Sequence, residues 1–115
     1  TTALPPGFTG KPWAADLHLA PDGRHLYASE RTSSTISVFE VDAASGRLTT
    51  LSHTATEKTP RGFAIDPSGR FLIAAGQDSH SITVHAIDPA SGALATLQRH
   101  PVGKNPNWIE IVELP

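Results

Sequence analysis

The chain repeats itself at a fixed step of 46 residues, which is the separation between Leu26 and Leu72. The phrase DAASGRL at 42–48 returns as DPASGAL at 88–94, and the runs before them, STISVFEV and HSITVHAI, are also alike. The register holds without a gap through turn and core positions. A period of this length indicates a repeat architecture, in which each repeat folds as one unit and stacks against the next.

Each repeat is predicted to contain four β-strands and no helix. Runs rich in β-branched and aromatic residues alternate with short turns such as PDGR, PSGR and ASGR, in which glycine supplies positive φ. No segment shows a sustained 3.6-residue period. The expected strands span residues 15–19, 25–30, 36–41 and 47–53 in the first repeat, and 62–66, 71–76, 82–87 and 93–99 in the second.

Four strands in one repeat match a β-propeller blade, which takes about 40 to 50 residues. We therefore predict an all-β fold with two four-stranded antiparallel blades, at 13–54 and 60–100, and a closing strand at 107–114 that begins a third blade. Two blades cannot close a ring, which needs about four or more. The chain 1–115 is therefore expected to be a C-terminal fragment of a larger propeller, with its open faces covered by other blades or by self-association. A small β-sandwich is the alternative.

Composition narrows the classes of partner. The net charge of −2 provides no basic surface for nucleic acid or for a membrane, and no apolar run approaches the length of a membrane span. The absence of cysteine excludes a disulfide framework and thiolate chemistry, which fits a cytoplasmic protein. The six histidines lack the spacing of zinc ligands, so no metal site is expected.

A candidate site follows from the geometry of a four-stranded meander. Because neighbouring strands are antiparallel, the start of each inner strand and the end of each second strand lie on one face of the disc. The residues at these places are Ala15, Arg61 and Asn107 at the openings of inner strands, and Arg31 and Gln77 after the second strands. The repeats agree in their turns and core but differ here, as an asymmetric ligand site requires.

Arg31 and Arg61 are the main candidates, because a guanidinium stays charged and its planar fork fits a phosphate or a carboxylate. The alternative is that Arg31 pairs with Glu30 or a nearby loop and that Arg61 is a solvated surface residue. His18 lies on an inner strand, where it faces either the channel or the blade interface. Trp13 and Trp108 are expected to pack between blades. No nucleophile elbow, phosphate-binding loop or paired-carboxylate spacing is present.

Three stretches resemble a known family: WAADLHLAPDGRHLYASERTSSTISVF, PRGFAIDPSGRFLIAAGQDSHSITVHAID and VGKNPNWIEI. They are similar to the C-terminal end of bacterial 6-phosphogluconolactonases of the seven-bladed propeller type, which are related to fungal carboxymuconate cyclases. The resemblance runs from Trp13 to Ile111 and implies a full protein about three times as long. It also implies cytoplasmic hydrolysis of 6-phospho-D-glucono-1,5-lactone in the pentose phosphate pathway, without a metal or organic cofactor.

The resemblance also implies roles for particular residues. The family's proposed site has a histidine, a glutamate and two arginines around the central channel. One of these arginines follows the second strand of a blade and corresponds to Arg31 in YASERTSS, which is therefore the expected catalytic residue. The other three groups lie in blades that this chain lacks, so the fragment alone is expected to be inactive. Arg61 occupies the equivalent of a site position in another blade, so the resemblance implies that it is a channel-facing substrate contact. The geometry of the repeat adds Gln77, His18 and Asn107 as expected contacts to a small anionic sugar lactone.

Two other functions remain open from the sequence. A muconate-type lactonizing cycloisomerase would need the same cationic funnel. A non-enzymatic surface or binding propeller is the other alternative, because DGRHLYASERTSSTISVFEVD is also similar to repeats of surface-layer propeller proteins. In the lactonase interpretation, Arg31 either stabilises the negative charge on the carbonyl oxygen as water attacks or holds the 6-phosphate.

Overall fold

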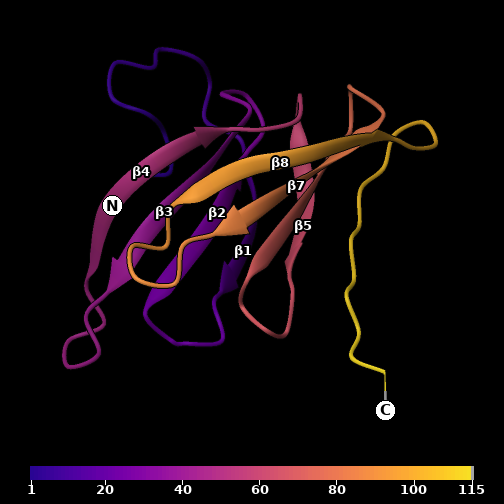
Figure 1. The fold of residues 1–115 in the computed structure, drawn as a ribbon. Coiled ribbons are helices and arrows are strands. Elements are labelled where there is room, and N and C mark those ends of the chain that lie inside the picture. The colour runs from indigo at the N-terminus through magenta and orange to yellow at the C-terminus, as the bar shows by residue number, and fades with distance from the viewer. Residues whose placement is uncertain (115) are drawn as a thin grey trace.

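The computed structural model describes residues 1–114, which contain eight strands in two sheets and no helix. Each sheet is an antiparallel meander in which the strands follow one another in chain order, and the two sheets stand side by side (Figure 1). The predicted all-β fold with two four-stranded blades is confirmed. The first blade comprises β1 (Ala14–Leu19), β2 (His25–Glu30), β3 (Thr35–Val41) and β4 (Leu48–Ala55), and the second comprises β5 (Pro60–Ile65), β6 (Phe71–Gly76), β7 (Ser81–Ile87) and β8 (Leu94–Pro101).

The main core lies between the two blades. Side chains alternate between the faces of a strand, so Tyr27 and Val38 point from the first blade toward the second, where Phe63 and Leu72 meet them. All four side chains are buried. The hydroxyl of Tyr27 donates a hydrogen bond to the carbonyl oxygen of Gly92 at 2.7 Å, which ties the blades together at the far side of the core.

The opposite face of the first blade remains open. Leu17 and Leu19 point outward from β1 and are exposed. Leu26 and Phe39, on β2 and β3, line a hollow of about 410 Å³ on this face. Contiguous apolar surface of this kind marks a place where another element packs.

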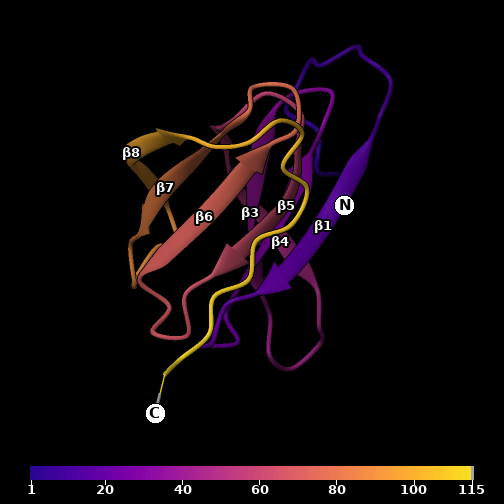
Figure 2. The ribbon, with the colours of Figure 1, turned by 90° about the vertical axis from the view of Figure 1, so that its right-hand side faces the viewer.

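Residues 107–114 form no strand in the structure, in contrast to the closing strand expected from the sequence. They run as an extended segment beside β5 (Figure 2). The physical reason is that an inner strand pairs with the second strand of its own blade, and this chain contains no second strand for a third blade. The segment therefore lies beside β5 without forming a hydrogen-bonded ladder.

Candidate functional site

A hollow of about 270 Å³ lies where the inner strands open, and we call it the rim hollow. It brings together Arg61 and Asn107, two of the residues predicted as substrate contacts, with Ala15 as the equivalent position in the first repeat. Their meeting follows from the ungapped step of the repeat, since equivalent positions of successive blades lie at the same rim. The rim hollow is lined by Ala15, Asp16, Arg61, Gly62, Asn107 and Trp108.

A backbone irregularity presents these residues to the hollow. The pairing of β1 with β2 shifts register between Ala14 and Leu17, and the pairing of β5 with β6 shifts between Pro60 and Phe63. The two shifts are equivalent in the repeat. Such bulges bend a strand locally and redirect its side chains, and they often lie beside functional sites. Here they release the openings of both inner strands from the ladder.

Gly62 allows the terminal segment to close the hollow. A Cβ atom at this position would lie 2.6 Å from the carbonyl oxygen of Asn107 and 3.2 Å from the Cα of Trp108. Any larger residue would therefore push the segment away from β5. Glycine at this position is a condition for the backbone of residues 107–108 to form one wall of the rim hollow.

Asp16 and His18 form a pair on β1. The Nε2 atom of His18 lies 3.0 Å from Oδ2 of Asp16, and the same oxygen accepts the backbone N–H of Phe63 at 3.4 Å. The His18 ring also meets the Phe63 ring edge-on, with centroids 4.7 Å apart. His18 thus lies at the interface between the blades, with its side chain 42% exposed, and it lines a neighbouring hollow rather than the rim hollow.

Arg31 lies at the same rim but outside the rim hollow. Its Nε donates to the carbonyl oxygen of Trp13 at 3.2 Å, its Nη2 donates to that of Ala14 at 3.1 Å, and its guanidinium stacks 4.0 Å from the Trp13 ring. Its place at this rim follows from the pairing of Glu30, the residue before it, with Ala14 at the opening of β1. Arg31 thus bonds the residue before β1 and the first residue of β1, whereas the alternatives expected for it were Glu30 or a nearby loop.

The Glu30 carboxylate bonds backbone N–H groups and does not pair with Arg31. This buried carboxylate accepts the backbone N–H of Trp13 at 2.5 Å and that of Thr32 at 2.6 Å. Gln77 is equivalent to Arg31 in the repeat, and its backbone N–H donates to the Thr59 carbonyl oxygen at 3.0 Å. It too lies outside the rim hollow. The roles of Arg31, Gln77 and the other candidates in binding or catalysis therefore remain predictions.

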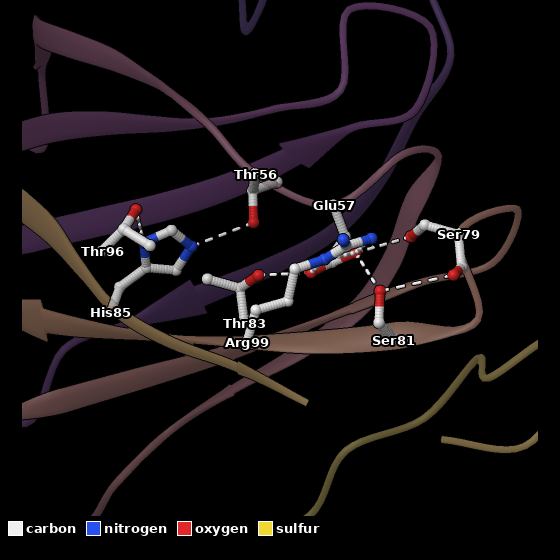
Figure 3. A network of polar contacts seen from close by, with 8 residues as sticks. All are labelled: Thr56, Glu57, Ser79, Ser81, Thr83, His85, Thr96 and Arg99. Atoms are coloured by element: carbon white, nitrogen blue, oxygen red, sulfur yellow. Dashed lines mark hydrogen bonds and ion pairs between the residues drawn. The ribbon is translucent and has the colours of Figure 1, made fainter. Parts of the chain in front are cut away.

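A second polar cluster, not expected from the sequence, surrounds Glu57 in the linker between the blades (Figure 3). The buried carboxylate accepts hydrogen bonds from Ser79 at 2.6 Å, from Ser81 at 2.5 Å, and from Thr83. Arg99, on the outermost strand, completes the set. Burial alone would raise the pKa of Glu57, but the hydrogen bonds from Arg99 and the three hydroxyls outweigh it and lower that pKa to about 2.

His85 lies in the same interface between the blades and is fully buried. Its Nε2 lies 3.0 Å from the Thr56 hydroxyl and its Nδ1 lies 3.3 Å from the Thr96 hydroxyl (Figure 3). Burial lowers the pKa of His85, against the smaller opposing effect of the Glu57 charge. No sequence signal indicated this cluster, because its members come from the linker, from the loop after β6 and from the two strands β7 and β8.

Within residues 1–114, no group of three or more histidine, aspartate or glutamate side chains is arranged to hold a metal ion. That stretch also contains no helix able to cross a membrane.

Comparison with known proteins gives consistent results. Residues 1–111 match the family model described as "Lactonase, 7-bladed beta-propeller". The chain is 52% identical over 112 residues to a 6-phosphogluconolactonase of Photorhabdus laumondii and 54% identical over 112 residues to one of Xenorhabdus nematophila. In both cases the match covers 97% of this chain and 34% of the relative, so the chain spans about a third of the length of these relatives.

A solved structure agrees with these matches. The Pseudomonas aeruginosa protein described as a periplasmic gluconolactonase superposes with a TM-score of 0.90 at 39% identity. The match covers 97% of this chain and 31% of that structure. The two blades of this chain therefore have the same arrangement as the matching part of that larger protein.

Proposed function

This chain belongs to the seven-bladed β-propeller lactonase family, and from that premise we propose that the intact protein hydrolyses 6-phospho-D-glucono-1,5-lactone to 6-phosphogluconate. The relatives that support this proposal bear the name 6-phosphogluconolactonase. Because the chain spans about a third of their length, the activity belongs to the whole protein. We expect the isolated chain to lack it, because the base that activates water would come from other blades.

The observation that carries the proposal is an unneutralised guanidinium in the rim hollow. Arg61 is exposed there and forms no ion pair with any carboxylate of residues 1–114. Beside it, Asn107 offers both a donor and an acceptor. A cation with an amide next to it suits an anionic, hydroxylated ligand, so we assign Arg61 to the phosphate.

Arg31 suits a different task. Its two backbone acceptors and the Trp13 ring hold the guanidinium in one orientation, but none of these groups carries a charge. The positive charge therefore remains available at the rim, in a fixed position. When water attacks the lactone carbonyl, the oxygen gains negative charge, and a preorganised cation stabilises that state without having to reorganise. The bond between the carbonyl carbon and the ring oxygen then breaks, which leaves the product carboxylate and a hydroxyl group that takes up a proton from the attacking water.

The open apolar faces of the two blades also indicate what packs against this chain in the intact protein. We propose that further blades of the same ring cover them, and that self-association covers them in their absence. The substrate is a small anionic sugar lactone. The cytoplasm stays our predicted location, although one similar structure is of a protein described as periplasmic.

A hybrid enzyme tests the proposal. In it, this chain replaces the matching 112 residues of the Photorhabdus relative. Hydrolysis of 6-phosphogluconolactone and gluconolactone is measured, together with the interconversion of a muconolactone and its open-chain muconate. We expect Arg31→Ala to lower kcat about 100-fold or more. We expect Arg61→Ala to raise KM for the phosphorylated lactone more than for gluconolactone.

Arg47→Ala is the matched control, because Arg47 is an exposed arginine in the turn between β3 and β4. It should leave kcat and KM as in the unmodified hybrid. Full turnover in the Arg31→Ala hybrid would remove the catalytic role of that residue. Turnover of the muconolactone alone would replace the proposed function with the cycloisomerase class.

A further inference from the structure

Trp108 is 74% exposed, although an indole of this kind was expected to pack between blades. It lines the rim hollow together with Arg61, and it also lines the neighbouring hollow of about 260 Å³ that contains His18. The rim hollow thus combines an aromatic side chain with a cation and an amide. A hollow lined by an aromatic group and a few convergent polar groups is the usual form of a ligand-binding site.

The position of Trp108 is set by the backbone. Its Cα and the carbonyl group of Asn107 lie so close to Gly62 that a Cβ atom there would clash with them. The bulge at the start of β5 holds Arg61 beside them. The indole, the guanidinium and the Asn107 amide are therefore three neighbours held by one short stretch of β5 and the segment that crosses it.

These chemical groups match the two kinds of surface on a sugar ring. The flat sides of a six-membered sugar ring carry C–H groups, which pack on an aromatic face, while its edge carries hydroxyl groups. Asn107 can donate to and accept from such hydroxyls. Asp16 also faces the rim hollow, and its carboxylate retains acceptor capacity beyond the bonds from Leu17, His18 and Phe63.

We propose that Trp108 is a specificity-determining residue whose indole stacks on the carbon face of the sugar lactone ring. In this arrangement Asp16 and Asn107 bond the ring hydroxyls while Arg61 takes the anionic group. The inference rests on the proposed function and adds the feature of the substrate that this site selects, a hydroxylated six-membered ring. A flat, open-chain dicarboxylate offers no such C–H face.

Tryptophan fluorescence of this chain tests the inference. Trp13→Phe leaves Trp108 as the only indole, since the chain has two tryptophans. We would titrate this variant with glucose 6-phosphate, which is a stable six-membered sugar ring with a phosphate, and separately with inorganic phosphate. Saturable quenching or a spectral shift with glucose 6-phosphate, absent with phosphate at equal concentration, is the expected result.

Calorimetry of variants provides the second measurement. We expect Trp108→Ala to weaken the binding of glucose 6-phosphate at least 10-fold and Trp108→Phe, which keeps an aromatic face, to weaken it by less. Binding without a change in Trp108 fluorescence would overturn the stacking, as would an equal response to inorganic phosphate or no binding at all. The proposed function is judged separately, by turnover of the hybrid enzyme. A Trp108 response in a hybrid without lactonase activity would leave the sugar site standing and remove the function.

Discussion

Arg99 donates hydrogen bonds to both oxygens of the Glu57 carboxylate, with its Nε 2.9 Å from Oε2 and its Nη2 3.2 Å from Oε1. The contact joins the linker between the blades to β8, the outermost strand of the second blade. Glu57 is buried, whereas the Arg99 side chain is 62% exposed. The carboxylate thus sits at a corner where the linker, the loop after β6 and β8 meet, four residues before Arg61.

The first blade also buries a carboxylate at the corresponding corner, but this carboxylate comes from the second strand of the blade and not from the segment before its first strand. There Glu30, the last residue of β2, accepts the backbone N–H of Trp13 in the preceding segment. The residue equivalent to Glu30 in the second blade is Gly76, and a Cβ atom on it would lie 2.5 Å from the Cβ of Glu57. We infer that each blade has one carboxylate niche, filled from the second strand in one case and from the linker in the other.

Glu57→Gln should destabilise the chain by about 1–3 kcal/mol at pH 7, because an amide nitrogen would then face hydroxyl and guanidinium donors in a buried place. Urea unfolding of this chain measures the change. Glu113→Gln is the control, since Glu113 is exposed in the terminal segment. An equal effect of the two substitutions would show that the niche contributes nothing specific.

The difference between wild type and Glu57→Gln should depend on pH in one direction. The pKa of Glu57 is lowered from 4.5 to about 2 in the folded chain. Its contribution to the free energy of unfolding is therefore present above pH 4.5 and is lost as the pH falls toward 2. Unfolding curves of both proteins should converge over that range, and a constant difference down to pH 2 would contradict the assignment.

His85→Phe should remove the loss of stability that the wild-type chain shows as the pH falls below 6.5. Burial lowers the pKa of His85 below 6.5, so the unfolded chain takes up a proton that the folded chain resists, and stability falls as the pH drops below 6.5. The first blade carries Phe39 at the equivalent position. Thermal unfolding between pH 7 and 5 measures the effect. His100→Phe, at an exposed site, should retain the slope of the wild type.

Gly76→Ala should destabilise the chain by about 1–3 kcal/mol, because the new methyl group would overlap the Ser79 hydroxyl, 1.9 Å away, and the Glu57 side chain. Gly103→Ala serves as the control, since nothing lies within 4 Å of a Cβ there. Denaturant unfolding gives the comparison. The double change Gly76→Glu with Glu57→Lys copies the first blade, where Glu30 and Lys11 hold the equivalent positions. A double variant no more stable than Gly76→Glu alone would argue against a shared niche.

Tyr27→Phe should cost about 1 kcal/mol through loss of the hydrogen bond to Gly92 between the blades. Burial, and then the Asp22 charge, raise the pKa of Tyr27 from 10.0 to about 12. The phenol's contribution is therefore complete below pH 10 and is lost as the pH rises toward 12. Alkaline unfolding of the two proteins tests this, and an identical slope above pH 10 would exclude a role for the buried phenol.

Part of the candidate site could be predicted from the sequence because the repeat has a fixed spacing of 46 residues. The ungapped step places Arg61 and Asn107 at equivalent points of successive blades, so their meeting in one hollow required no knowledge of side-chain partners. The same spacing predicted that Arg31 follows the second strand of its blade, but not the direction of its side chain, which depends on the ring of Trp13 and two carbonyl groups. Nor could it show that residues 107–114 would lie beside β5 without a ladder, because that depends on a strand the chain does not contain.

The sequence by itself determined the period, the eight strands, the turns between them and the rim on which the variable positions lie. These properties depend on alternation and turn chemistry within a few residues. The tertiary structure alone decided the place of Trp108 at the rim hollow, the orientation of Arg31 and the cluster around Glu57. The partners in those contacts come from separate segments, such as Glu57 and Arg99, which are 42 positions apart. Only folding brings such groups within hydrogen-bonding distance, and no local pattern in the sequence records that they will meet.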